Sequence, residues 1–410
     1  MKKVNINKFD FISPRFEREN INLGLLRIKK ALKELNNPCK NTPAIQIIGT
    51  NGKGSITAFI ESILFVERKN IGVTTSPHIF EISERIRVNK QNISKEEFEK
   101  LFKTIEDKVS KYKLSPFEKI ICCAISFFDF KKVDLLILEA GLGGRLDATT
   151  AHKLRPIIAI GNIGIDHKEY LGDSIEKIAK EKVAVIEKDA FVISCRQNIH
   201  VEEIIKKRVK EVGAKIIWKK SLSKDFELGL KGSFQRQNAA VAIGAIEALN
   251  NIGFNIKKCS INKGLKNTIW PGRLEIIKCF NREILIDSAH NFHAAKALSK
   301  ERKTWENEGK GVYWILGVQK QKDISSMIKV LIKRNDYLIL VPVPNQNSWR
   351  VKDLSNMTGI DKLKIIEFEK VDLAFNYLLG LKEWPSCRPV LTGSIFLVGE
   401  FIKFAKNQTY

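Results

Sequence analysis

The chain contains 410 residues, which is too long for one ordinary domain and fits two. Hydrophobic residues make up 44% of the chain and charged residues 28%, as in globular proteins, and the formal net charge at pH 7 is +24. No run of about 18 apolar residues occurs, which excludes a transmembrane helix. The basic N-terminus precedes no apolar segment, so we expect no signal peptide.

The first part of the chain alternates apolar strands with amphipathic helices. The predicted elements in chain order are strand 44–50, helix 53–66, strand 71–77, helix 94–112, strands 133–142 and 156–164, and helices 174–186, 201–212 and 238–250. The helix at 94–112 opens with the capping-box pattern Ser94-x-x-Glu97. This alternation predicts an α/β fold in which helices cover both faces of a parallel sheet.

The segment Trp270-Pro271-Gly272-Arg273 interrupts the alternation, which then begins again. The second set of predicted elements comprises strand 284–287, helix 293–305, strands 312–317 and 337–342, and helix 373–379. We therefore predict two domains, residues 1–275 and residues 276–410.

The cysteines and the charge indicate the compartment and the class of partner. The seven cysteines are scattered and form no Cys-x-x-Cys pair, so we expect reduced core thiols in a cytoplasmic protein rather than disulfides or a zinc site. The positive field attracts anions, which include nucleic acids, acidic membranes and small polyanionic substrates. Because the chain has no long basic run, we expect charge spread over solvated faces, with no nucleic-acid or membrane partner.

A glycine-rich turn, residues 49–55, lies between the first predicted strand and helix. Its sequence is Gly49-Thr50-Asn51-Gly52-Lys53-Gly54-Ser55. Glycines let backbone N–H groups face phosphates, Lys53 adds a positive charge, and the helix N-terminus adds its dipole. The standard phosphate loop has four residues before its Gly-Lys pair, whereas only two stand here, so a structural turn is the alternative. The placement of Lys53 and Ser55 favours nucleotide binding.

This turn resembles the nucleotide loop of the folylpolyglutamate synthase/dihydrofolate synthase family, a branch of the Mur ligase group. Eight motifs follow the family's order across nearly the whole chain: 49–55, 75–78 with 84–89, 138–150, 165–167 with 181–182, 234–240, 271–273, 287–291 and 392–400. The resemblance implies a P-loop-like parallel-sheet N-terminal domain and a smaller Rossmann-like C-terminal domain, with the active site in a cleft.

Three positions depart from the family's usual residues. Phe292 stands where proline is usual, Val183-Ala184 replaces Ala-Gly, and Ile121 replaces a threonine. None is an expected metal or phosphate ligand, although Ile121 lies near the expected pterin side.

The resemblance implies an ATP-dependent ligase that adds L-glutamate to dihydropteroate, to folyl(poly)glutamate or to both. The route would be an acyl phosphate, with ADP and phosphate as products, and Mg²⁺ would help to neutralise the charged reactants. The stretch Asn22-Leu23-Gly24-Leu25 and Ser115-x-Phe117 look like the bifunctional form. We expect a monomer with small-molecule partners only. The alternatives are another Mur-type amino-acid ligase and a P-loop protein that acts on nucleic acid.

By the same resemblance, the site residues fall into four groups. The ATP-binding residues would be Thr50, Asn51, Gly52, Lys53, Gly54, Ser55, Asn238, Arg273, Asp287 and His290. The metal ligands would be Ser55, Ser76, Glu139 and His167, and the catalytic residues Lys53, His167 and Lys182. Ser115 and Phe117 would lie on the pterin side of the substrate.

Several of these residues have plainer interpretations on chemistry alone. Glu139 and Asp287 could cap helices, His167 could be a loop histidine, and Phe117 could belong to the core. His290 and His293 could form a metal pair, and His152 and His200 are expected to be exposed.

Lys182 matches the family's carbamylated lysine. A free ammonium would repel Mg²⁺, whereas a carbamate offers the hard oxygens that Mg²⁺ prefers. Carbamylation needs a neutral amine, and burial beside cations lowers the pKa of a lysine. The alternative is a solvated helix lysine, since Lys177, Lys180 and Lys188 lie nearby.

Overall fold

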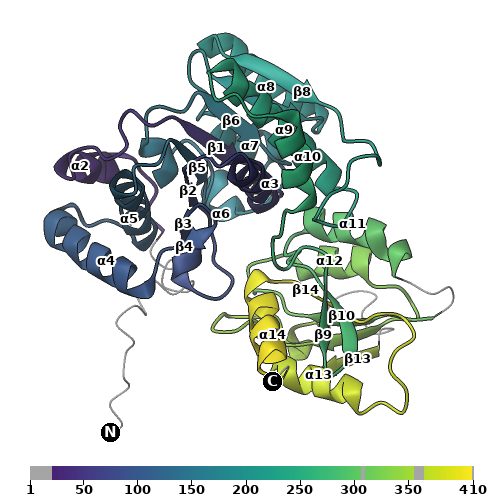
Figure 1. The fold of residues 1–410 in the computed structure, drawn as a ribbon. Coiled ribbons are helices and arrows are strands. Elements are labelled where there is room, and N and C mark those ends of the chain that lie inside the picture. Colours follow the sequence, from purple (N-terminus) through teal and green to yellow (C-terminus); the bar gives the residue numbers. More distant parts are fainter. Residues whose placement is uncertain (1–20, 306–309, 355–363, 409–410) are drawn as a thin grey trace, which may run out of the picture. The chain divides into compact units, whose positions relative to one another are not determined.

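The computed structural model describes residues 21–305, 310–354 and 364–408. The N-terminal segment for which we expect no signal peptide lies outside these residues. The chain forms two compact units (Figure 1), one comprising the residues up to Gly229 together with Gln235–Ile269, the other Leu230–Phe234 and the residues from Trp270 on. Leu230–Phe234 therefore belongs to the second unit although its neighbours in sequence belong to the first.

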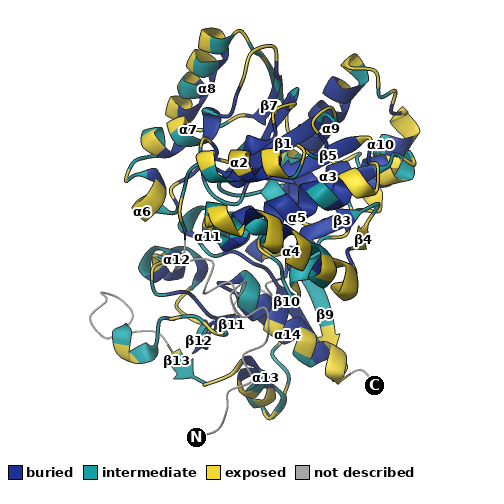
Figure 2. Ribbon diagram, turned by 90° about the vertical axis from the view of Figure 1, so that its left-hand side faces the viewer, coloured by how far each residue is buried: buried dark blue, intermediate teal, exposed yellow. Residues whose placement is uncertain are grey.

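The first unit contains an eight-stranded sheet in the order β4-β3-β2-β5-β1-β6-β7-β8. The parallel strands are β1 (Ala44–Ile48), β2 (Ile71–Thr74), β5 (Leu135–Glu139), β6 (Ile157–Ile160), β7 (Phe191–Cys195) and β8 (Lys215–Lys219). Every residue of β1 and of β5 is buried, as the dark ribbons of Figure 2 show. The predicted strands in this region are confirmed, with shorter bounds.

The edge of this sheet departs from the prediction of a parallel sheet. Strands β3 (Ile86–Val88) and β4 (Gln91–Asn92) run antiparallel to their neighbours. Asn89 and Lys90, the two residues between these strands, have φ angles of 52° and 66°. A two-residue turn of this kind can only join antiparallel strands, because a parallel pair needs a longer crossover.

Helices cover both faces of the sheet. Among residues 21–269, the α-helices of this unit are α2 (Leu26–Glu34), α3 (Lys53–Val66), α4 (Lys95–Val109), α5 (Pro116–Phe130), α6 (Lys168–Leu171), α7 (Ile175–Val183), α8 (Ile199–Val212), α9 (Gln235–Asn251) and α10 (Lys258–Lys266). Helices α3, α9 and α10 pack together on one face, whereas α5, α7 and α8 contribute to the clusters on the other. The predicted helices are confirmed, and Ser94 caps α4 with Glu97 as expected.

The second unit contains a six-stranded sheet in the order β13-β12-β11-β14-β10-β9. Its strands are β9 (Glu275–Cys279), β10 (Arg282–Ile286), β11 (Tyr313–Leu316), β12 (Tyr337–Leu340), β13 (Lys364–Glu367) and β14 (Val390–Thr392). All pairs are parallel except β9 with β10, which are joined by the two-residue turn Phe280-Asn281. Its helices are α11 (Phe292–Glu301), α12 (Ile324–Leu331), α13 (Val371–Leu379) and α14 (Ile395–Asn407).

Two expectations about side-chain exposure need correction. His152 is 5% exposed, and its Nε2 atom lies 2.9 Å from the carbonyl oxygen of Thr42, so the prediction of an exposed histidine is wrong. Burial also lowers the pKa of His152. His200 is exposed as expected. All seven cysteines are free and six are buried, but Cys259 is exposed. None of the described helices is long and apolar enough to cross a membrane.

Candidate active site

Four adjacent strands of the first unit bring the predicted metal and phosphate residues to one edge of the sheet. These strands, in the order β2-β5-β1-β6, are parallel, so their carboxyl ends share an edge. Ser76 follows β2, Glu139 ends β5, and the 49–55 loop follows β1. The segment that contains His167 follows β6. This edge is the usual position of a binding site in an open parallel sheet.

The 49–55 loop is fastened to the segment that follows β6. The backbone N–H groups of Thr50 and Asn51 donate to the carbonyl oxygen of Asn162 at 2.8 and 3.0 Å. The hydroxyl of Thr50 donates to the carbonyl oxygen of Gly164 at 2.8 Å. A Cβ atom at Gly49 would lie 3.1 Å from the backbone of Gly161. These contacts hold the glycine-rich loop in a defined conformation.

Gly52 and Ser55 connect the loop to α9. Gly52 caps α3 with a φ angle of 87°, and a Cβ atom there would collide with the side-chain amide of Asn238. Asn238 donates to Gln235 Oε1 at 2.8 Å, and Gln235 Nε2 donates to the hydroxyl of Ser55 at 3.2 Å. Gln235 is a residue of this site that the sequence analysis does not predict, although it lies in the 234–240 motif. Gly54 is buried in the first turn of α3.

Two lysine amines converge on one backbone carbonyl. Lys53 Nζ donates to the carbonyl oxygen of Gly49 at 3.1 Å, and Lys182 Nζ donates to the same oxygen at 3.0 Å. Lys182 is 5% exposed, so the alternative of a solvated helix lysine is wrong. Burial, and then the charge of Lys53, lower the pKa of Lys182 to about 7. Near neutral pH, a large fraction of Lys182 is therefore the neutral amine.

The glycine motif after Glu139 packs directly on the helix that carries Lys182. Glu139 itself is 4% exposed at the end of β5. A Cβ atom at Gly144 would collide with the carbonyl oxygen of Lys182, so only glycine allows this approach. The N–H of Arg145 donates to the carbonyl oxygen of Glu181 at 3.0 Å. Asp147 accepts from the N–H of Leu142 at 2.9 Å, and burial raises the pKa of Asp147.

His167 and Ser76 occupy loops at the same edge. His167 has left-handed backbone angles (φ 51°, ψ 45°), and its N–H donates to the carboxylate of Asp166 at 2.9 Å. Ser76 is half-buried and precedes a cis peptide bond to Pro77. No group of three or more His, Cys, Asp or Glu side chains suited to a metal occurs among residues 21–305, 310–354 and 364–408. The expected metal ligands include only two residues of these four types, Glu139 and His167, because the other two ligands are Ser55 and Ser76.

The residues predicted for the pterin side lie at the start of α5. The hydroxyl of Ser115 accepts from the N–H of Glu118 at 3.3 Å, which makes Ser115 the N-cap of this helix. Phe117 is partly buried against the core, and its ring lies so close to Gly141 that a Cβ atom there would come within 2.7 Å. Phe117 thus belongs to the core and also borders the glycine motif.

The second unit holds Arg273, Asp287 and His290. Asp287 follows β10, is 5% exposed, and accepts from the N–H groups of Leu274 and Ala289 at 3.0 and 2.9 Å. Burial raises the pKa of Asp287, whereas the charge of Arg273 opposes this. The helix that follows is capped by Asn291, so the alternative that Asp287 caps it is wrong. His290 Nδ1 lies 2.9 Å from the carbonyl oxygen of Ser288, which can only accept, so Nδ1 donates this hydrogen bond.

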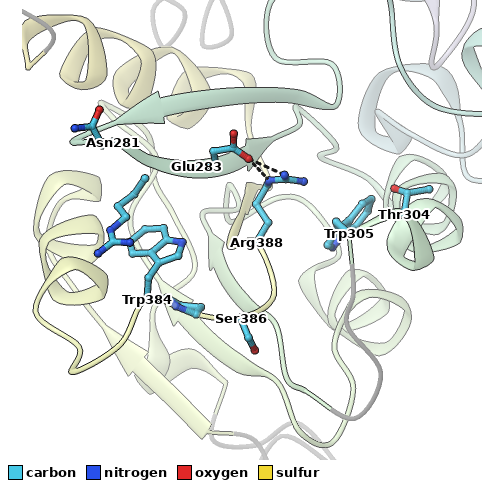
Figure 3. A pocket seen from close by; sticks show the side chains of 9 residues that line it. Asn281, Glu283, Thr304, Trp305, Trp384, Ser386 and Arg388 are labelled. Carbon is cyan, nitrogen blue, oxygen red and sulfur yellow. Dashed lines mark hydrogen bonds and ion pairs between the residues drawn. The ribbon is translucent and has the colours of Figure 1, made fainter.

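A pocket elsewhere in the second unit contains none of the predicted site residues (Figure 3). It lies at the amino end of β10, where Arg388 pairs with Glu283 at 2.7 Å and Arg282 lies over the ring of Trp384. Because Asp287 follows the carboxyl end of the same strand, this pocket and Asp287 lie at opposite ends of β10.

Comparisons with known proteins agree with this arrangement. A family model described as the C-terminal domain of dihydrofolate synthetase matches residues 273–404. A probable dihydrofolate synthetase of Schizosaccharomyces pombe is 30% identical over 424 residues, which covers 94% of this chain and 99% of that protein. The chain belongs to the dihydrofolate synthase/folylpolyglutamate synthase family.

Other members of the family have both activities in their names. The dihydrofolate synthase/folylpolyglutamate synthase of Bacillus subtilis is 32% identical over 342 residues. The aligned region covers 75% of this chain and 78% of that protein. The structure of the bifunctional folylpolyglutamate synthase/dihydrofolate synthase of Yersinia pestis, complexed with AMPPNP and Mn ion, has a TM-score of 0.82 and is 25% identical. It covers 94% of each chain. The predicted fold class is confirmed, and the matches favour neither of the alternative functions.

Substitution of Gly144 tests the contact between the glycine motif and α7. In Gly144→Ala the added methyl must separate the motif from Lys182, which we expect to cost about 1–3 kcal/mol of unfolding free energy and to reduce catalytic activity. Denaturant unfolding and steady-state kinetics measure the two effects.

Gly380→Ala is the matched control, because a Cβ atom there would meet only carbonyl oxygens at 3.6 Å. This control should retain wild-type stability and activity. A Gly144→Ala enzyme that behaved like the control would show that the close approach is unimportant.

Proposed function

We propose that this chain is an ATP-dependent ligase that joins L-glutamate to a pteroate-type acid. The observation that carries the proposal is the relationship to a dihydrofolate synthetase over 94% of the chain. The arrangement of the phosphate loop, Glu139 and Lys182 around one sheet edge supports it.

The chemistry proceeds in two displacements. A carboxylate oxygen of the acceptor attacks the γ-phosphorus of ATP, the bond between that phosphorus and the bridging oxygen breaks, and ADP leaves. The amine of glutamate then attacks the acyl carbon, the acyl C–O bond breaks, phosphate leaves, and the nitrogen loses a proton. Coupling to the cleavage of ATP makes formation of the amide favourable overall, and the second displacement is easier because phosphate is a better leaving group than hydroxide.

The 49–55 loop would bind the phosphates of ATP. Its fixed conformation and the N-terminus of α3 direct N–H groups to one place, and such donors need no reorganisation when charge develops. Lys53 supplies the positive charge. Asn238 holds the side chain of Gln235, which in turn donates to Ser55. We propose an ATP-binding role also for Arg273, Asp287 and His290. We further propose that residues 1–275 form the main ATP-binding domain and that residues 276–410, which contain Asp287 and His290, form the glutamate-ligase domain.

The residues around the sheet edge fit a divalent cation. The buried carboxylate of Glu139 and the hydroxyls of Ser55 and Ser76 are hard oxygen donors of the kind that Mg²⁺ prefers, and His167 adds a nitrogen. A bound Mg²⁺ would neutralise the negative charge of the phosphates. The Mn ion and AMPPNP in the Yersinia pestis relative support a divalent metal and a nucleotide here.

The relatives also inform the choice of acceptor. The family model and the Schizosaccharomyces pombe relative are named for dihydrofolate synthetase, which supports dihydropteroate as an acceptor. The Bacillus subtilis relative carries both names, which supports folyl(poly)glutamate as a second acceptor. Phe117, beside Gly141, is positioned to contribute an aromatic surface for a pterin ring.

The reaction is tested by measuring ATP cleavage with each acceptor in turn. We expect ADP and phosphate to form only when L-glutamate and dihydropteroate, or L-glutamate and a folylglutamate, are both present. Chromatography should show one added glutamate for each ADP. Formation of AMP and pyrophosphate would exclude the acyl-phosphate route, and ATP cleavage that is independent of both co-substrates would contradict the proposed function.

We also propose that Lys182 is carbamylated. The lone pair of Nζ attacks the carbon of CO₂, an N–C bond forms, and one proton leaves, so the ammonium is replaced by an anion. The buried amine, with its pKa of about 7, supports this step because only the neutral form reacts. An anion at this position would also relieve the repulsion between Lys182 and Lys53.

Carbamylation is tested with ¹³C-labelled bicarbonate and NMR. The wild-type enzyme should give a carbamate signal above pH 7 that weakens as the pH falls below 7, because protonation of Lys182 removes the nucleophile. Lys182→Ala should lose the signal and nearly all activity, with partial recovery in acetate or formate.

Lys180→Ala is the control, since Lys180 is an exposed lysine of the same helix. It should keep both the signal and the activity. A Lys182→Ala enzyme with wild-type activity would remove this residue from the mechanism.

A further inference from the structure

Gln46 is a buried polar residue in the middle of an otherwise apolar strand. It lies in β1, whose sequence is Ala-Ile-Gln-Ile-Ile, and its side chain is 0% exposed. Burial of an amide without hydrogen bonds is costly, so its partners must be accounted for. Its Nε2 atom donates to the hydroxyls of Thr149 and Thr150 at 3.0 and 2.7 Å, and its Oε1 atom accepts from Arg155.

The two threonine hydroxyls connect Gln46 to the glycine motif by donating further hydrogen bonds. Because the amide of Gln46 can only donate to them, each hydroxyl must direct its single proton elsewhere. Thr150 donates to the carbonyl oxygen of Gly144 at 2.8 Å, and Thr149 donates to the carboxylate of Asp147. Gln46 thereby fixes the segment that follows Glu139.

Arg155 connects Gln46 to the residues that follow α7. Its side chain is 2% exposed, and it donates to the carboxylate of Glu187 at 2.6 Å and to the carbonyl oxygen of Val185 at 3.4 Å. Helix α7 ends at Val183, one residue beyond Lys182. The carbonyl side of Gln46 therefore holds the chain just after Lys182, while its amide side holds the glycine motif.

These two segments contact each other where the chemistry is proposed. Gly144 lies against the backbone of Lys182, and Arg145 bonds to Glu181. We infer that Gln46 is a positioning residue of the ligase reaction, which holds the glycine motif and the Lys182 segment in register through Thr149, Thr150 and Arg155. The inference rests on the proposed function for its catalytic consequence but not for the contacts themselves.

Thr150 offers the mildest test of this network. Replacement of the fully buried Gln46 could prevent folding, whereas Thr150 is only partly buried. Thr150→Val keeps the shape and removes the hydroxyl, so the bond to Gly144 is lost. Thr150→Ser keeps the hydroxyl. Thr268→Val, which removes a buried hydroxyl that donates to Gly264 at 2.7 Å outside this network, is the matched control.

The experiment combines steady-state kinetics with hydrogen exchange of residues 141–150. We expect Thr150→Val to lower kcat roughly 10- to 100-fold, since small misplacements of reacting groups have effects of this size. The KM for L-glutamate should stay unchanged, because Thr150 lies outside residues 276–410, for which the glutamate-ligase role is proposed. Amides of the glycine motif should exchange faster in Thr150→Val, whereas Thr150→Ser and Thr268→Val should match the wild type in kcat and in exchange of this segment.

The inference is overturned if Thr150→Val and Thr268→Val have the same kcat and the same exchange in residues 141–150. A wild-type enzyme with no glutamate-dependent ATP cleavage would refute the proposed function instead. In that case the exchange comparison alone would still decide whether the hydroxyl of Thr150 holds the glycine motif.

Discussion

The candidate active site depends on one electrostatic constraint, the presence of two lysine amines on the carbonyl oxygen of Gly49. Two ammonium groups at this separation repel each other, and burial removes the water that would screen them. Lys182 is buried and Lys53 is partly buried, and one shared carbonyl oxygen compensates little for two ammonium charges. The constraint is relieved if Lys182 is neutral or carries a carbamate, and the lowered pKa of Lys182 has this physical origin.

Close approaches at three glycines surround the two lysines. Gly49 lies against Gly161, Gly52 against the side chain of Asn238, and Gly144 against Lys182. A Cβ atom at Gly52 or Gly144 would collide with its neighbour, and one at Gly49 would be tightly packed. Gly49 and Gly144 therefore let the segments after β1, β5 and β6 converge at one edge of the sheet, and Gly52 lets α9 approach the loop. The polar side chain of Gln46 then fixes the convergence from within the sheet, where an apolar residue would leave the threonine hydroxyls without a donor.

The sequence analysis places these glycines in the expected site motifs, but it does not show which atoms they approach. The strand-loop-helix pattern around residues 49–55 and the alternation of apolar runs are local, and so the strands and helices that were predicted occur in the predicted order. Strands β7 and β8 and helices α10 and α12 are among the elements that were not predicted. Helix α5 was not predicted because its central run, Ile-Ile-Cys-Cys-Ala-Ile, is apolar throughout, and a short apolar run of this kind is as consistent with a buried strand as with a buried helix. The antiparallel pairs β3–β4 and β9–β10 are joined by the two-residue turns Asn89-Lys90 and Phe280-Asn281, whose residues have positive φ angles. Neither pair of residues is a typical hairpin sequence such as Asn-Gly, so these turns were not predicted.

Burial at the site is likewise non-local. Lys182 is surrounded in sequence by other lysines, and it is buried because Gly49 and Gly144, far away in the chain, lie against it. Gln46 carried a readable signal, since a lone amide within an apolar strand requires partners, but Thr149 and Arg155 could not be identified before the fold was known. The N-cap of α11 was misassigned in one alternative because Asn291 and Asp287 are equally suited to that role by residue type.

The central claim is that Lys182 titrates far below an ordinary lysine because it is buried beside Lys53. NMR of enzyme with ¹³C- and ¹⁵N-labelled lysine, in buffer free of CO₂, measures this directly. We predict a pKa for Lys182 of about 7 in the wild type, compared with an ordinary value of 10.5, and a higher pKa in Lys53→Met. A Lys182 that titrates near its ordinary value and does not respond to Lys53→Met would contradict the account.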